Sequence, residues 1–226
     1  MCSANQTEII EKISEEQLQS FMYFPSAVYT IEKPEFLEIS KKVCGEKFKK
    51  IKKERKLDEI YPVYMTDNLF GDERMKEAIQ YILDTGWNIL QSQGYNMSNL
   101  QTTFTEMWCQ EHYKHSAMEQ HTHGGAVQLV GFYFLDVPEN SSKVVFHDPK
   151  AGKVQINLPE TDMVQATFAS NMINFTPKEG LLMFTNSWLA HSFTRRASTK
   201  PMRFIHFNIA VQQAPQVCAV SDAEVI

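Results

Sequence analysis

The second half of the chain, from Gln101 onward, consists of short runs rich in aromatic and β-branched residues. Turn formers separate most of these runs, for example Pro138-Glu139-Asn140 and Asp148-Pro149-Lys150. Many short strands at this spacing predict a sandwich or jelly roll. The predicted strands are Thr103–Tyr113, Val127–Leu135, Lys143–Phe146, Val164–Phe168, Gly180–Phe184, His191–Arg195 and Met202–Val211.

The first hundred residues carry helical patterns instead. Asp72–Gln93 places an apolar stripe along one side of a helix, with glycines near both ends. Helices are also predicted from Thr7 to about Met22 and from about Glu35, with a strand over Phe24–Ile31 between them. We therefore expect one mainly β domain with flanking helices over residues 1–226: a mainly helical support (1–100), a jelly-roll core (101–212) and a tail (213–226).

The bulk composition, with 43% hydrophobic and 22% charged residues, is ordinary for an enzyme domain. No run of eighteen or more apolar residues is present, so no membrane span is predicted. The N-terminus lacks a basic segment followed by an apolar core, so no secretory signal is expected. The four cysteines lack CxxC spacing, which favours reduced thiols and a cytoplasmic location; they are Cys2, Cys44, Cys109 and Cys218.

A basic block spans residues 41–56, with nine Lys or Arg against Glu46 and Glu54. Such a block could attract nucleic acid or an acidic substrate. Apolar residues recur through the same segment at helical spacing, however, and no base-reading motif accompanies it. We therefore interpret it as an amphipathic helix with a lysine-rich solvated face.

The candidate site begins with His121-Thr122-His123. On an extended segment, two histidines two residues apart point to the same side. A third histidine, His191, follows a buried strand and a turn, and it can close a metal site with them. Imidazole suits divalent iron, nickel, copper and zinc. Glu119 lies on the same strand face as His121 and is the reserve carboxylate ligand.

Arg203 begins the last long strand, where alternation places it on one face with Ile205, Phe207 and Ile209. An arginine that points into an apolar barrel is costly unless an anion pairs with it. A bidentate contact with a carboxylate is the natural partner. His206 faces the other way and receives no role.

These features together resemble a known family. Trp108, His121-Thr-His123, Gly131-Phe-Tyr-Phe-Leu, Ser187-Trp-Leu-Ala-His191, Arg203 and Phe207-Asn208 occur in the order found in 2-oxoglutarate/Fe(II) oxygenases of phages and marine bacteria. The resemblance covers about residues 104–212. It implies a double-stranded β-helix, with His121, His123 and His191 binding Fe(II). It also implies that Arg203 pairs with the far carboxylate of 2-oxoglutarate, in a bacterial or phage-infected cell.

The chain departs from the family pattern at three hydroxyl positions, where Val130, Phe134 and the pair Ile205 and Phe207 stand. Some of those hydroxyls help to hold the cosubstrate. A third histidine in place of the carboxylate ligand also raises the charge of the metal site by one. This change favours anionic coligands.

The expected activity is O2-dependent hydroxylation of a C–H bond in an unidentified substrate, with release of succinate and CO2. One alternative is a cupin-type metal-binding protein or non-redox metalloenzyme that does not use 2-oxoglutarate. Another is a non-catalytic interaction protein that retains the fold. A zinc site built from Cys109, His112 and His115 is disfavoured, because on a strand His112 faces away from the other two.

Overall fold

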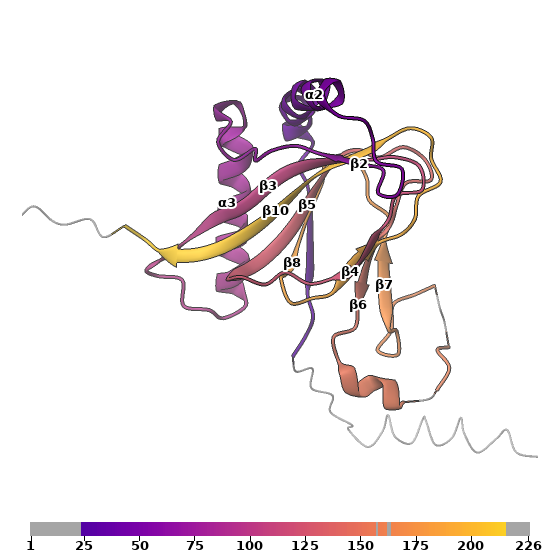
Figure 1. Cartoon of the computed structure of the whole chain (residues 1–226). Coiled ribbons are helices and arrows are strands. Elements are labelled where there is room, and N and C mark those ends of the chain that lie inside the picture. Colours follow the sequence, from indigo (N-terminus) through magenta and orange to yellow (C-terminus); the bar gives the residue numbers. More distant parts are fainter. Residues whose placement is uncertain (1–23, 157, 162–163, 216–226) are drawn as a thin grey trace, which may run out of the picture.

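The predicted jelly roll is confirmed in a computed structural model, which describes residues 24–215 except 157, 162 and 163. Two sheets form the roll, and every pairing between their described strands is antiparallel (Figure 1). The larger sheet has the order β1 (Val28–Glu32), β8 (Leu181–Asn186), β5 (Val127–Asp136), β10 (Met202–Gln213), β3 (Leu100–His112) and β2 (Val63–Met65). The smaller sheet has the order β4 (Met118–His121), β9 (His191–Phe193), β6 (Val144–His147) and β7 (Met172–Phe175).

Two helices cover the outer face of the larger sheet (Figure 1). They are α2 (Leu37–Glu54), entered through the 3-10 turn η1 (Pro34–Phe36), and α3 (Lys76–Ser92), entered through η2 (Glu73–Met75). A further 3-10 turn, η3 (Ala151–Gln155), follows β6. The helix predicted over Thr7–Met22 lies outside the described residues. Within the part of the chain that is described, no helix is long and apolar enough to cross a membrane.

The central strand β10 separates two hydrophobic cores. Ile205 and Phe207 pack toward the helices, in the core that contains Phe48 of α2. Phe204 points to the opposite side, into the interior of the roll, where Phe132 and Phe193 join it from both sheets. A strand that is buried on both faces has this near-continuous apolar character. The position of each β10 residue therefore decides whether its side chain meets the helices or the roll interior.

The basic block forms most of α2, as the amphipathic interpretation predicts. Val43, Cys44 and Phe48 are buried on the sheet side of the helix. Several lysines on its other faces pair with carboxylates: Lys41 with Asp136 and Glu179, Lys47 with Asp67, and Lys52 with Glu111. Part of the positive charge is therefore neutralised within the protein.

One predicted strand is wrong. Residues 164–168 lie in bends and turns, with Val164 and Phe168 largely exposed. The strand next to β6 is β7 instead, which brings Phe175 opposite Val144 and against the ring of Phe146. Both segments have the composition of a strand, and pairing with β6 selects β7. The short strands β2 and β4 were also missing from the predicted set.

Gly131 in β5 provides a test of this packing. A Cβ atom built at this position would overlap the ring of Phe207 and the carbonyl oxygen of Met183. We expect Gly131→Ala to lower the free energy of unfolding by about 1–3 kcal/mol, because the ring must leave its place. Gly45→Ala in α2 is the matched control, since its Cβ meets no atom within 4 Å. Urea unfolding should show the control unchanged or stabilised, and equal behaviour of the two variants would contradict this packing.

Candidate metal centre

Three histidines meet where β4 ends and β9 begins. His121 and His191 are paired across these strands, with their ring centroids 4.5 Å apart. His123 follows β4, and its backbone N–H donates to the Ser187 carbonyl at 2.9 Å. One ligand atom from each ring lies within 4.8 Å of the others. Among the described residues, this is the only group of His, Cys, Asp or Glu with metal-site spacing.

Hydrogen bonds orient two of these rings. His121 Nδ1 donates to the carbonyl of Glu119 at 2.8 Å, and His191 Nδ1 donates to the carbonyl of Leu189 at 3.0 Å. Each bond keeps the proton on Nδ1 and leaves the lone pair of Nε2 free for a metal. The Nε2 atoms of His123 and His191 are buried and have no hydrogen-bond partner.

Burial keeps the imidazoles of His123 and His191 neutral. Burial is the main cause that lowers the pKa of His123 to about 4, and the neighbouring His121 adds to it. The pKa of His191 is also lowered to about 4, mainly by burial, although its bond to the Leu189 carbonyl opposes the shift. Metal ions bind the unprotonated ring. At neutral pH, His123 and His191 therefore meet a metal without first losing a proton.

The donor set fits Fe(II). Three neutral nitrogens on one side of a metal leave its other positions open for small ligands, and imidazole is a suitable ligand for iron. A bound metal would give a partner to the two buried nitrogen atoms that lack one, the Nε2 atoms of His123 and His191. Imidazole alone does not distinguish iron from nickel, copper or zinc.

The other metal candidates are not brought together. Glu119 is exposed, and its carboxylate is not part of the group; it contributes its backbone carbonyl instead. Cys109 is buried on the helix side, whereas His112 lies in the roll between Gln110 and Ser116. His115 is exposed.

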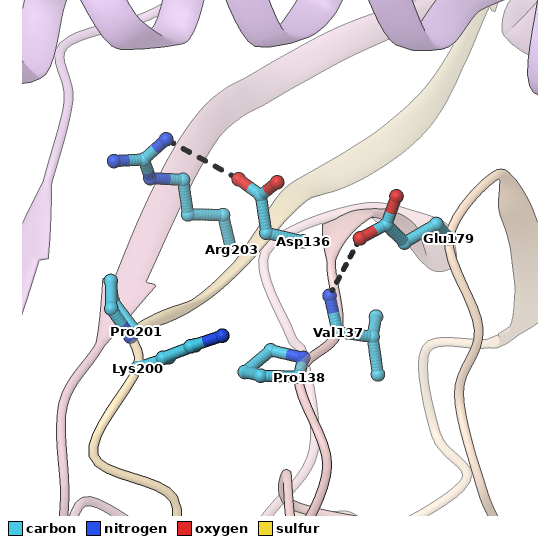
Figure 2. Close-up of a pocket in the computed structure, with 7 residues that line it drawn as sticks. All are labelled: Asp136, Val137, Pro138, Glu179, Lys200, Pro201 and Arg203. Atoms are coloured by element: carbon cyan, nitrogen blue, oxygen red, sulfur yellow. Dashed lines mark hydrogen bonds and ion pairs between the residues drawn. The ribbon is translucent and has the colours of Figure 1, made fainter.

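Arg203 is not brought to the three histidines. It lies on the helix-facing side of β10, where its guanidinium covers the ring of Phe48 at 5.6 Å. Its Nε donates to Glu111 at 2.5 Å. Its Nη1 donates to Asp136 at 3.3 Å (Figure 2). Both carboxylates are its neighbours across the adjacent strands. The expectation that Arg203 points into the barrel is thus corrected, because its anions come from the protein.

Arg196 is a further arginine near the roll, and it is buried at 1% exposure. Its guanidinium donates to the carbonyls of His112 and Lys200. The aromatic rings of Phe132, Phe193 and Phe204 pack against one another between the histidine group and His112. Arg196 therefore belongs to the far end of the roll, where it holds two loops together.

His206 is the residue that the sequence analysis missed. It faces away from Arg203, as predicted, but this side is the roll interior that holds the histidine group. Its ring lies 5.2 Å from the ring of His123 and 4.7 Å from that of Trp108. Alternation along the last strand, counted from Arg203, contained this signal. The pattern alone does not show that Arg203 faces the helices, so it gives no role to His206.

Comparison with known proteins agrees with this geometry. Residues 106–208 match the profile of a family described as "Putative 2OG-Fe(II) oxygenase". No curated protein sequence matches the chain significantly. Among solved structures, AviO1 from Streptomyces viridochromogenes Tue57 is 10% identical, with 96% of this chain and 99% of that chain covered and a TM-score of 0.59. A Pseudomonas putida prolyl-4-hydroxylase is 10% identical, with coverages of 82% and 92% and a TM-score of 0.52.

A third similar structure, HygX from Streptomyces hygroscopicus, was solved with nickel and 2-oxoglutarate bound. It is 10% identical, with 92% of this chain and 86% of that chain covered and a TM-score of 0.52. At these identities the solved structures establish a shared fold. The family profile is the observation that connects this fold to iron and 2-oxoglutarate.

The placement of Arg203 predicts a structural role. Burial raises the pKa of the fully buried Glu111, but hydrogen bonds from Lys52, Tyr113 and Arg203 outweigh it and hold the pKa below its usual value. Arg203→Met removes one cation from this carboxylate and should lower the free energy of unfolding by about 2–3 kcal/mol. Lys150→Met is the control, because Lys150 is 59% exposed and its contact with Asp148 is 3.7 Å long. Equal stability of both variants in urea would contradict this role.

The buried imidazoles predict lower stability in acid. The pKa is about 4 in His123 and His191 and about 3 in His112, against about 6.5 in an unfolded chain. Between about pH 6.5 and pH 4 only the unfolded chain binds these protons. The free energy of unfolding should therefore fall by up to about 1.4 kcal/mol per pH unit for each such histidine. Urea unfolding of the metal-free protein measures this slope, which His112→Gln should reduce; a flat profile would refute it.

Proposed function

We propose that His121, His123 and His191 are the protein ligands of the iron. The chain belongs to the 2OG-Fe(II) oxygenase family, whose profile matches residues 106–208. The chain is a Fe(II)- and 2-oxoglutarate-dependent oxygenase. When bound, the iron supplies O2 activation coupled to the oxidative decarboxylation of 2-oxoglutarate. The observation that carries the assignment is the convergence of three imidazoles, two of which have their Nε2 atoms freed by backbone hydrogen bonds.

The protein contributes position and protection from water. The pairing of β4 with β9 fixes His121 opposite His191, and the Ser187 carbonyl fixes the backbone of His123. The rings of Phe132 and Phe146 pack against His191 and shield it from solvent. Rigid, dry surroundings keep ligand geometry constant while the other metal positions exchange small molecules.

We further propose that the reaction hydroxylates a C–H bond of a substrate that enters at the exposed side of the histidine group. Hydroxylation is supported by the prolyl hydroxylases among the structures that share this fold. An epimerase and a carbocyclase share it too, so the fold itself does not select the outcome. The substrate class is left to a screen.

A reducing, cytoplasmic setting in a bacterial or phage-infected cell is part of the same proposal. Cys44 and Cys109 support it, because both are buried and free although their thiols are within hydrogen-bonding reach of each other. An oxidising compartment would favour a bond between thiols so placed.

The assignment of ligands predicts a spectroscopic result. Anaerobic addition of 2-oxoglutarate to the Fe(II)-loaded protein should produce a weak visible metal-to-ligand charge-transfer band. His191→Ala and His123→Ala should abolish the band and lower the iron content, because each removes a lone pair that no neighbouring group replaces. Glu119→Gln is the matched control and should retain both, because its side chain lies outside the group.

Three outcomes would revise this proposal. Stoichiometric iron without a band in the wild-type protein would indicate a cupin-type metal protein that does not use 2-oxoglutarate. Loss of iron in Glu119→Gln but not in His123→Ala would make the carboxylate the third ligand. A protein that binds no metal after anaerobic purification would indicate an interaction protein that retains the fold.

A further inference from the structure

We propose that Trp108 and His206 hold a carboxylate of the metal-bound 2-oxo acid through neutral N–H groups, without an arginine. This inference rests on the proposed function and adds the residues that bind its cosubstrate. Neither residue is a metal ligand in this proposal. Arg203, which the sequence analysis assigned to this task, stays with Glu111 and Asp136 outside the roll.

Position is the first argument. Trp108 on β3 and His206 on β10 are paired across neighbouring strands, and both point into the roll. The ring of His206 contacts the ring of His123, so the two residues extend the histidine group along the roll interior. A ligand bound to the metal on this side would lie beside these two rings.

Unused hydrogen-bonding capacity is the second argument. Trp108 Nε1 and His206 Nδ1 are buried and make no hydrogen bond within the described structure. An indole N–H can only donate, so the group that Trp108 lacks is an acceptor. His206 is 1% exposed, and its imidazole can offer one N–H to an oxygen atom.

His112 shows that a buried imidazole elsewhere in the roll finds partners within the protein. It is buried and points into the roll, at 1% exposure on β3. Both of its ring nitrogens are engaged, by Gln110 at 2.8 Å and by Ser116 at 3.2 Å. The fold can thus satisfy a buried imidazole without a ligand. The pair next to the metal group is left unsatisfied.

Two amide oxygens, of Gln128 and Asn208, are also buried without a partner. Both sit at inward-facing positions of β5 and β10. As acceptors they cannot hold a carboxylate themselves, and Asn208 is close enough to His206 to compete with the carboxylate for its N–H.

Charge is the third argument. A site with two histidines and one carboxylate gives Fe(II) a net charge of about 1+, and an added arginine brings the pocket to about 2+. Three neutral histidines leave the full 2+ on the metal site without any arginine. This charge balances a dicarboxylate in a low-dielectric pocket. The third histidine therefore leaves the pocket with the positive charge that an arginine inside the roll would otherwise supply. Neutral donors then suffice to orient the ligand.

The test is the anaerobic 2-oxoglutarate titration of Fe(II)-loaded Trp108→Phe and His206→Phe, which keep an aromatic ring and remove the N–H. Each should raise the concentration for half-maximal charge-transfer absorbance by about tenfold, the loss of one hydrogen bond to a charged group. His206→Gln, which retains an N–H, should recover part of the loss. Iron content and near-ultraviolet circular dichroism should match the wild type. Arg203→Met and His112→Gln are the controls and should titrate like the wild type.

Each other result overturns the inference. Wild-type titration curves for Trp108→Phe and His206→Phe would remove both residues from cosubstrate binding. A higher half-maximal 2-oxoglutarate concentration for Arg203→Met alone would show that Arg203 binds the carboxylate. Loss of iron in His206→Phe would make His206 a fourth metal ligand. The absence of a band from the wild-type protein would instead overturn the proposed function itself.

Discussion

The alternation of side chains along β10 determines the arrangement of the whole molecule. This strand lies between β5 and β3 in the larger sheet, so each of its side chains faces either the helices or the roll interior. Ile205 and Phe207 anchor the helices, whereas Phe204 and His206 face the roll. A slip of one residue would exchange these sets and turn Arg203 into the roll interior. The chemistry of the site therefore depends on the register of one strand.

The sequence predicted this alternation but not the side on which the roll lies. Both faces of β10 are apolar, so periodicity groups its residues without stating which group is inside. The physical rule applied to Arg203, that a buried guanidinium needs an anion, was correct. Its anions are Glu111 and Asp136, which face it across β3 and β5. That pairing depends on strand register, which a single sequence does not contain.

The long elements and the three histidines could be predicted because their signals are local. The apolar stripe of α3 can be read from the sequence, and two histidines two residues apart on an extended segment face the same side. Strands of three or four residues, such as β2 and β4, carry too little pattern to be recognised. The same limit explains the choice of Val164–Phe168 over β7. The role of His206 could not be predicted for a different reason: it depends on which face of the sheet is enclosed.

The distribution of unsatisfied groups connects folding to function. Nine buried side-chain atoms lack a hydrogen-bond partner among the described residues, and six of them belong to inward-facing residues around the histidine group: Trp108, His123, Gln128, His191, His206 and Asn208. Each buried polar group without a partner costs about 1–3 kcal/mol of stability. A fold that satisfies His112 completely has no general difficulty with such groups. For the four ring nitrogens among them, this concentration is best explained by ligands: a metal for His123 and His191, and a carboxylate for the N–H donors of Trp108 and His206.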